Sequence, residues 1–305
     1  MYKVFIDGSA GTTGLKIVER LSGRPDITLI TLPENLRKDY GARKECLNSC
    51  DVAFLCLPDT ASIEAVSMIE NPLVKVIDTS TAHRTKDDWA YGFSELKGFK
   101  EKIEKSNKIA NPGCHASGVI SLIKPLIDNS LINKDICLSC FSLTGYTGGG
   151  KKMIAEYEGD KPFLYNAPRQ YALGQSHKHL PEIEKVCSLS TSPCFCPIVS
   201  DFDCGMQVTI PIFRKDLTCK VETLKECYKD YYKGGLVYYS EETENGFISA
   251  LSFSGKDSLA VSVFGNEDRI LLVSRFDNLG KGASGAAIQN MNIVLGIEES
   301  TGLVL

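Results

Sequence analysis

The segment that most constrains the fold is the first one, where an apolar run leads directly into a glycine-rich turn and then into a helix-like stretch. Residues 2–7 read YKVFID, residues 8–14 read GSAGTTG, and residues 15–21 read LKIVERL with apolar residues at helical spacing. A strand, a glycine turn and a helix in this order are typical of a dinucleotide-binding unit. We therefore expect a Rossmann-type domain to begin here.

Each glycine of the turn has its own expected task. Gly8 makes the tight turn, Gly11 lets backbone N–H groups approach a pyrophosphate, and Gly14 brings helix and strand together. Phosphates then lie at a helix N-terminus, which favours anions. The cofactor-binding residues predicted in this turn are Gly8, Ser9, Gly11, Thr12, Thr13 and Gly14. Because the spacing is GxxGxxG rather than GxGxxG, a purely structural turn is the alternative.

The pattern that follows predicts the architecture. Apolar runs at residues 27–31, 52–58 and 75–80 suit buried parallel strands, and helix-compatible residues such as 60–70 lie between some of them. This alternation predicts a doubly wound parallel α/β sheet, with ligands at the carboxyl ends of its strands.

The pattern changes from about residue 131, where long β-rich runs predict an α+β domain with a mostly antiparallel sheet. We expect residues 1–113 with a C-terminal helix at 281–305 to form the nucleotide-binding domain. Residues 114–280 are then the catalytic and oligomerisation domain.

One of the twelve cysteines has a setting that favours chemistry. Cys114 stands between an Asn-Pro-Gly turn and the helix-like residues 115–123, so it is expected at a helix N-terminus, which stabilises a reactive thiolate. Pro125 is expected to kink or end that helix. A buried structural thiol is the alternative, and the other cysteines are expected to be mostly small buried hydrophobes.

A base for this thiol has few sources, because the chain has only four histidines. His177 and His179 precede Pro181 and Glu182, which suit a first helical turn. One of the pair is expected to be a general acid/base, and which one is left open. In an extended backbone the two would point to opposite sides, so that only one faces Cys114. Without a third ligand at suitable spacing, we expect no metal site.

Composition argues against several classes of protein. The net charge of −4 gives no basic footprint for nucleic acid or an anionic membrane. No apolar stretch approaches the roughly 20 residues that span a bilayer. The first residues lack the features of a signal peptide, so a cytoplasmic protein is expected.

The choice of dinucleotide depends on residues 34–38. Glu34 lies where an acid often binds the ribose 2′-OH of NAD. Arg37 and Lys38 offer charges for the 2′-phosphate of NADP, although a solvated helix face is the alternative.

Five segments taken together resemble one enzyme family, the short form of the N-acetyl-γ-glutamyl-phosphate reductases. They are GSAGTTG (8–14), DTSTAHRTKDDWAYGFSEL (78–96), NPGCHASG (111–118), ALGQSHKHLPEIE (172–184) and DNLGKGASGAAIQNMN (277–292). The resemblance implies NADPH-dependent reduction of N-acetyl-γ-glutamyl phosphate to N-acetylglutamate 5-semialdehyde and phosphate, in arginine biosynthesis, through a thioester on Cys114. It also implies a homo-oligomer, a dimer or tetramer.

The same resemblance implies roles for further residues. Arg84 and Asn111 are expected to bind substrate, and Asn278 and Gly282 to lie near the nicotinamide or ribose. From the residues alone, Arg84 is equally compatible with a surface ion pair to Asp87 or Asp88. The alternatives for the whole chain are a reductase of a related acyl phosphate (aspartyl or aminoadipyl phosphate), a non-catalytic dinucleotide-binding protein, and a thiol hydrolase.

Overall fold

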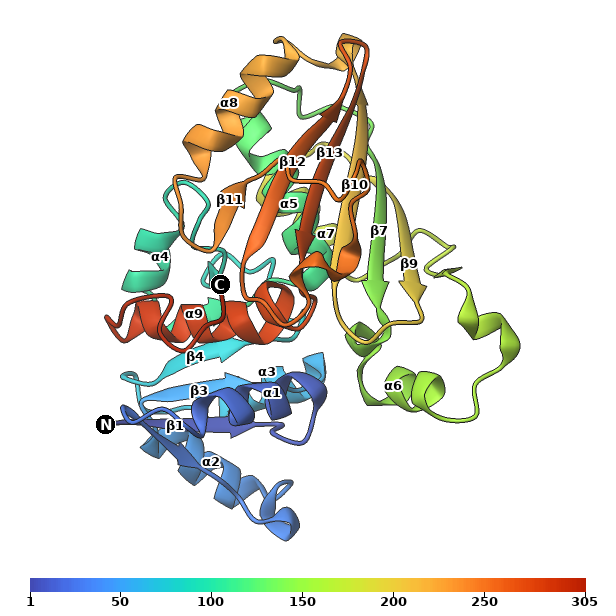
Figure 1. The fold of residues 1–305 in the computed structure, drawn as a ribbon. Coiled ribbons are helices and arrows are strands. Elements are labelled where there is room, and N and C mark those ends of the chain that lie inside the picture. Colours follow the sequence, from blue (N-terminus) through green and yellow to red (C-terminus); the bar gives the residue numbers. More distant parts are fainter. The chain divides into compact units, whose positions relative to one another are not determined.

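The computed structural model describes residues 1–305 and divides them into two compact units (Figure 1). The first unit comprises Met1–Pro112 and Ala283–Leu303, and the second comprises Gly113–Gly282 and Val304–Leu305. Val304 joins the second unit through backbone and side-chain hydrogen bonds with Asp257. No helix is long and apolar enough to cross a membrane.

The first unit is built on a six-stranded sheet in which every pair of neighbours is parallel, in the order β2-β1-β3-β4-β6-β5. Its strands are nearly continuous apolar runs because helices cover both faces, and the predicted doubly wound sheet is confirmed. They are β1 (Tyr2–Asp7), β2 (Ile27–Ile30), β3 (Val52–Leu55), β4 (Lys75–Asp78), β5 (Ala90–Tyr91) and β6 (Lys108–Ala110).

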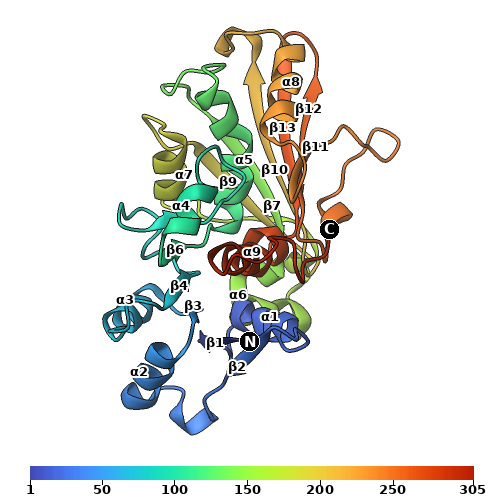
Figure 2. The same cartoon turned by 90° about the vertical axis from the view of Figure 1, so that its left-hand side faces the viewer.

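Two apolar cores lie on opposite faces of this sheet. Helices α1 (Thr12–Leu21), α4 (Lys100–Lys105) and α9 (Gly285–Val294) pack on one face, where Ile17 and Met291 are fully buried. Helices α2 (Tyr40–Ser49) and α3 (Asp59–Ser67) cover the other face, as Figure 2 shows. Strand β2 lies on one side of β1, and β3 lies on the other side. The strand order therefore reverses between β1 and β3. Sheets of this kind bind ligands at the carboxyl ends of the strands where the order reverses.

The second unit contains a seven-stranded sheet in the order β11-β12-β13-β10-β7-β9-β8. Four of its six strand pairs are antiparallel and two, β7–β9 and β11–β12, are parallel, which confirms the predicted mostly antiparallel sheet. The strands are β7 (Ser139–Gly145), β8 (Arg169–Gln170), β9 (Cys194–Ser200), β10 (Met206–Phe213), β11 (Val237–Tyr239), β12 (Leu259–Gly265) and β13 (Arg269–Phe276).

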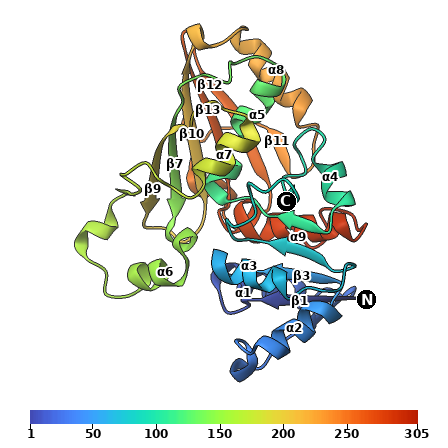
Figure 3. The ribbon, with the colours of Figure 1, turned by 180° about the vertical axis from the view of Figure 1, so that it is seen from behind.

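Helices cover only one face of this second sheet. Figure 3 shows α5 (Cys114–Asp128) and α7 (Leu180–Cys187) in front of the strands, and α8 (Val221–Tyr231) packs beside α5. The short helix α6 (Gly150–Glu158) follows β7. The opposite face exposes Phe141, Phe213 and Leu271 by 46%, 54% and 41%. Strand register places these three side chains on the same face of the sheet.

Pro125 was expected to kink or end the helix that starts at Cys114, yet α5 continues past it to Asp128. A proline has no N–H, so the carbonyl of Ser121, four residues earlier, loses its helical donor. The Tyr232 hydroxyl replaces that donor, at 2.9 Å from the Ser121 oxygen. A side chain from outside the helix thus satisfies the group that proline leaves unpaired.

Candidate active site

In the glycine turn after β1, neighbouring backbone atoms leave no room for a side chain at two positions. Gly8 has φ +84°, and a Cβ there would lie 2.3 Å from the Cys56 carbonyl oxygen. A Cβ on Gly14 would lie 2.5 Å from the Gly8 oxygen, because α1 passes directly over the turn. The predicted tasks of tight turn and close helix–strand approach therefore have a steric basis.

The start of α1 leaves room and donors for an anion. A Cβ on Gly11, the N-cap residue, would lie no nearer than 3.4 Å to another atom, so packing alone does not demand glycine there. No side chain caps the helix. The Thr12 hydroxyl oxygen is buried without a hydrogen-bond partner. Ser9 and Thr13, in the same turn, are half-buried. An uncapped N-terminus with an unsatisfied buried hydroxyl fits a bound phosphate group.

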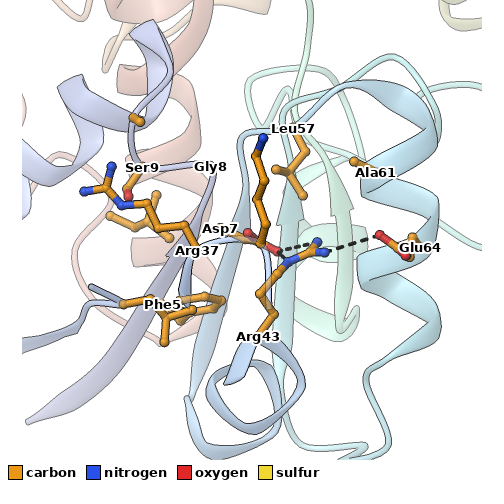
Figure 4. A pocket seen from close by; sticks show the side chains of 13 residues that line it. Phe5, Asp7, Gly8, Ser9, Arg37, Arg43, Leu57, Ala61 and Glu64 are labelled. Atoms are coloured by element: carbon orange, nitrogen blue, oxygen red, sulfur yellow. Dashed lines mark hydrogen bonds and ion pairs between the residues drawn. The ribbon is translucent and has the colours of Figure 1, made fainter. Parts of the chain in front are cut away.

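A cavity of about 500 Å³ opens beside this turn, within the first unit (Figure 4). Its lining includes Gly8, Ser9, Leu32 and the cations Arg37, Lys38 and Arg43, and does not include Glu34.

The three cations differ in their partners. Arg43 is buried and reaches Asp7 at 2.9 Å and Glu64 at 3.3 Å, so its charge is already matched. Arg37 and Lys38 are exposed and make no side-chain hydrogen bond or ion pair. Figure 4 shows Arg37 on the side of the glycine turn. Their charges are therefore available to an anionic ligand in the cavity.

Cys114 is the first residue of α5 and is half-buried. No side chain caps this helix either, and the Gly113 N–H donates to the buried carboxylate of Glu182 at 3.2 Å. Gly282 packs directly against the cysteine, since a Cβ on Gly282 would lie 2.9 Å from the Cys114 Cβ. The backbone donors and dipole of the helix N-terminus favour the thiolate form of Cys114.

The two histidines before α7 lie together rather than on opposite sides of the chain. Their ring centroids are 4.8 Å apart, and His179 has a helical rather than an extended backbone, so the alternation expected of an extended segment does not apply. The His179 N–H donates to Nδ1 of His177 at 3.2 Å. Burial, together with the charge of Lys178, lowers the pKa of His177 to about 4. At neutral pH, His177 is thus an uncharged imidazole.

His115 joins the same group of rings, with centroids 5.3 Å from His177 and 5.6 Å from His179. The sequence analysis gave His115 no role and did not predict its hydrogen-bond partners Ser142 and Tyr171. The available signal was its position directly after Cys114 in the sequence. The second unit therefore gathers one thiol and three imidazoles around the start of α5.

His83, the remaining histidine, is held in the first unit by a buried aspartate. Its Nδ1 lies 2.6 Å from the Asp78 carboxylate, and its ring stacks on Trp89 at 4.0 Å. Burial alone would raise the pKa of Asp78, but hydrogen bonds from His83, Ser62 and Ser80 outweigh it and lower the pKa. Much of the DTSTAHR motif thus builds a structural network at the end of β4.

Arg84 and Asn111, expected to bind substrate, are both buried and both bonded within the first unit. Arg84 donates from Nε to the Asn111 carbonyl and from Nη2 to the Thr79 carbonyl, each at 2.9 Å. Asn111 donates to the Ala283 carbonyl and accepts from the amide of Asn290, both at 3.1 Å. These bonds hold the turn that leads from β6 towards Cys114.

Asn278, expected near the nicotinamide or ribose, holds the glycine-rich loop after β7. Its Oδ1 accepts from the Gly205 N–H at 2.8 Å, and its Nδ2 donates to the Thr147 hydroxyl at 3.0 Å. A Cβ on Gly148 would lie 3.4 Å from the Asn278 amide. The structure thus shows Asn278 positioning this loop.

Family models match most of the chain. A semialdehyde dehydrogenase NAD-binding domain matches residues 32–106, and a semialdehyde dehydrogenase dimerisation domain matches residues 114–278. These matches agree with a nicotinamide dinucleotide as the cofactor of the first unit.

Solved structures share the fold at low sequence identity. Aspartate semialdehyde dehydrogenase II of Vibrio cholerae, complexed with ASA, superposes with a TM-score of 0.72 at 16% identity over 97% of this chain and 98% of that one. The aspartate semialdehyde dehydrogenase of Candida albicans with NADP gives 0.65 at 15% identity over 97% and 98%.

Relatives of higher identity specify the family. N-acetyl-γ-glutamyl-phosphate reductase of Sinorhizobium medicae is 43% identical over 96% of this chain and 98% of its own length. The enzyme of the same name from Brucella ovis is 44% identical over 96% and 99%. An oxidoreductase fold, a thiol at a helix N-terminus with histidines beside it, and end-to-end identity at this level lead to one conclusion: the chain belongs to the N-acetyl-γ-glutamyl-phosphate reductase family.

Proposed function

We propose that this chain reduces N-acetyl-γ-glutamyl phosphate with NADPH to N-acetylglutamate 5-semialdehyde and phosphate. The observation that carries the proposal is Cys114 at the uncapped N-terminus of α5, followed in the sequence by His115, whose ring lies against those of His177 and His179. The chain matches the reductases along nearly its whole length. A dinucleotide-binding protein without catalysis would need no such thiol.

The chemistry begins with a proton moving from the Cys114 thiol to a neutral imidazole, His177 or His179. The sulfur attacks the acyl carbon, the bond from that carbon to the phosphate oxygen breaks, and phosphate leaves with the electron pair. NADPH, when bound, supplies the hydride that reduces the resulting thioester. Backbone N–H groups at the start of α5 stabilise the oxyanion on the reduced carbon.

Collapse of that oxyanion breaks the carbon–sulfur bond, releases the aldehyde and returns the sulfur as a thiolate. The imidazolium then gives its proton back to Cys114, and the departing phosphate takes one proton from solvent, so that the cycle consumes one proton overall. A reaction that needs a reduced thiol fits a reducing compartment, and the cytoplasm stays the predicted location.

For the cofactor we propose NADP rather than NAD. Arg37 and Lys38 line the cavity beside the glycine turn with unmatched charges, whereas Glu34, the residue that would favour NAD, does not line it. Positive charges at this position suit a 2′-phosphate. The phosphates of the dinucleotide would bind at Gly8, Ser9, Gly11, Thr12, Thr13 and Gly14.

We also propose that the chain forms a homo-oligomer through the open face of its second sheet. Phe141, Phe213 and Leu271 are exposed on that face, and the matching family model is that of a dimerisation domain. Large apolar side chains exposed on one face of a sheet are typical of an interface between subunits.

The test of the proposed function is the reaction run backwards. With N-acetylglutamate 5-semialdehyde, phosphate and NADP, the protein should generate the absorbance of reduced nicotinamide, and with aspartate semialdehyde it should not. Cys114→Ser should keep NADPH binding and lose the reaction, while Cys137→Ser, an exposed cysteine on the same unit, should keep both. Substantial turnover by Cys114→Ser would exclude the covalent route.

A further inference from the structure

Glu182 is a buried carboxylate beside the helix that starts with Cys114, and the reaction scheme above does not use it. It lies in the first turn of α7, and only 1% of the residue is exposed. Helix α7 packs against α5, and Figure 3 shows the two helices on the same face of the second sheet. Because a buried carboxylate is costly unless it is paired or hydrogen-bonded, the contacts of Glu182 indicate what it does.

The position of Glu182 in its own helix would ordinarily give it a contact there. His179 is the N-cap residue of α7, so Glu182 is the third residue of the helix. A glutamate at that position commonly accepts a hydrogen bond from the N–H of the N-cap residue, in the motif called a capping box. In this chain the His179 N–H donates to Nδ1 of His177, at 3.2 Å. The preceding histidine thus satisfies the donor that the Glu182 carboxylate would otherwise bind.

The carboxylate of Glu182 extends to the other helix. Its Oε2 accepts a hydrogen bond from the Gly113 N–H at 3.2 Å, and the two residues are 69 positions apart in the sequence. Gly113 is the N-cap residue of α5 and directly precedes Cys114. Its carbonyl accepts from the Ser117 N–H at 2.8 Å, which begins the hydrogen bonding of the helix. Since glycine has no side chain with which to cap or pack, the N-cap of α5 is held from outside by α7.

The negative charge of Glu182 does not by itself help a nucleophilic sulfur. Like charges repel, so a carboxylate bonded to the residue before Cys114 disfavours the thiolate form of that cysteine. The dipoles of α5 and α7 both favour a carboxylate at their N-termini, which offsets part of the cost of its burial. Any advantage for the nucleophile therefore comes from where the acceptor oxygen holds the Gly113 N–H, and not from the charge.

We propose that Glu182 is a positioning residue, which holds the N-cap of α5 against the first turn of α7 and so sets Cys114 relative to the histidines before α7. The inference rests on the proposed function, in which Cys114 is the nucleophile and one of those histidines is the acid/base. Residues 177–182 then supply both the imidazoles and the acceptor that places the start of α5. No bond is broken by this contact, and no proton is transferred.

Three substitutions separate the reach of the Glu182 side chain from its charge. Glu182→Gln keeps the length and an acceptor oxygen but removes the charge. Glu182→Asp keeps the charge but is one methylene shorter, and Glu182→Met keeps the length but has no oxygen. Glu184 lies on the same helix and accepts from the Ser192 hydroxyl at 2.7 Å, so Glu184→Gln and Glu184→Asp are the matched controls.

Each variant is assayed with N-acetylglutamate 5-semialdehyde, phosphate and NADP. Glu182→Gln should keep kcat within about threefold, whereas the Asp and Met variants should each lose about 10- to 100-fold, because catalysis is sensitive to shifts of about an ångström. KM for the semialdehyde should change much less than kcat, since the loss is in the chemical step. Both Glu184 variants should keep kcat. A merely structural role would lower the melting temperatures without this order of kcat values.

The order of the variants decides the proposal. Glu182→Asp with at least the kcat of Glu182→Gln overturns it, because charge and not reach would then matter. If the Asp variant does not fold, Glu182→Met with the kcat of Glu182→Gln overturns it. A folded Glu182→Gln that loses more than about tenfold in kcat also overturns it, because the amide oxygen can still accept from the Gly113 N–H.

A second measurement follows the contact without turnover. Exchange of the Gly113 amide hydrogen, obtained from overlapping peptides by mass spectrometry, should be faster in the Asp and Met variants than in Glu182→Gln. An unaltered chain that shows no turnover would overturn the proposed function, and with it the role of Glu182 in that reaction, even with this order of exchange rates. An active unaltered chain whose Glu182 variants all keep its kcat would retain the reductase and overturn the positioning role.

Discussion

At the scale of single residues, the position of Cys114, the proposed nucleophile, depends on a neighbour that has no side chain. Gly282 has no Cβ, and a Cβ there would lie 2.9 Å from the Cys114 Cβ and 3.0 Å from the Asp277 carbonyl oxygen. Neither neighbour is the flexible end of a side chain. Alanine at this position must therefore displace the start of α5 or the segment that carries Gly282 itself.

We expect Gly282→Ala to lower kcat by about 10- to 100-fold, since small displacements of a nucleophile are costly. NADPH binding should change less. Gly23→Ala is the matched control, because nothing lies within 4 Å of the added carbon and the backbone there is ordinary. Steady-state kinetics and a dinucleotide titration of both variants check this, and equal kcat values for the two would contradict it.

A second residue-scale prediction concerns the choice of cofactor. Replacing both Arg37 and Lys38 by alanine should raise KM for NADPH by about tenfold or more, because hydrogen bonds to charged groups are worth about 1.5–3 kcal/mol. KM for NADH should change little. Lys16→Ala, an exposed lysine paired with Glu19 on α1, is the control. A parallel rise for both cofactors would show that these residues do not bind the 2′-phosphate.

At the scale of elements, buried polar groups fix the ends of strands and helices. Asp78 ends β4 and accepts hydrogen bonds from Ser62, Ser80 and His83 at 2.6–2.9 Å. Its lowered pKa means that the charged form is favoured by folding. The stabilisation is therefore present at neutral pH and is lost as the pH falls below the ordinary aspartate value of 3.8 through the still lower value of the folded state.

Asp78→Asn should lower the free energy of unfolding of the first unit by about 2 kcal/mol at pH 7. Both carboxylate oxygens of Asp78 accept hydrogen bonds, whereas only the oxygen of an asparagine amide can accept one. The difference from the unaltered chain should shrink as the pH is taken below about 4. Trp89 is the only tryptophan and stacks on His83, so its fluorescence reports this region. Asp88→Asn, an exposed ion-pair variant, should have a small effect. A difference that is independent of pH would contradict the argument.

At the scale of the whole molecule, one sheet is covered on both faces and the other on one. The first sheet lies between two apolar cores, and the second leaves Phe141, Phe213 and Leu271 exposed. Exposed apolar side chains on one sheet face are costly in a monomer and favourable between subunits. The asymmetry supports the proposal that the subunits associate through the second unit.

Leu271→Lys should therefore shift the protein towards monomers, because a lysine cannot be buried without a partner. Leu173→Lys is the matched control, since Leu173 is 74% exposed and lies outside the sheet. Sedimentation or light scattering at micromolar concentration measures the mass. The same mass for both variants would place the interface elsewhere.

Local patterns were sufficient for much of this protein. The run from β1 through GSAGTTG to α1 lies within twenty residues or so, and glycine sterics, apolar periodicity and the unpaired donors of a helix start act over that range. For the same reason the NPGC segment alone predicted Cys114 at the beginning of a helix, and it does begin α5. Alternating βα segments likewise indicated the parallel sheet.

What surrounds the thiol was decided only in three dimensions. The start of α5 is contacted by residues from several distant segments, namely Ser142, Tyr171, the two histidines before α7, and Gly282. These residues meet there because β7, β8, α7 and the segment after β13 pack around the helix start. No spacing within a short stretch of sequence predicts which distant segments pack together. Pro125 is a second example. From the sequence it was expected to kink or end the helix, but α5 continues past it, and the Tyr232 hydroxyl at the end of α8 donates to the Ser121 carbonyl that the proline leaves without its helical donor. Short-range sterics and hydrogen bonding follow from neighbours in the chain, whereas the partners of a buried polar group depend on which elements the apolar cores bring together.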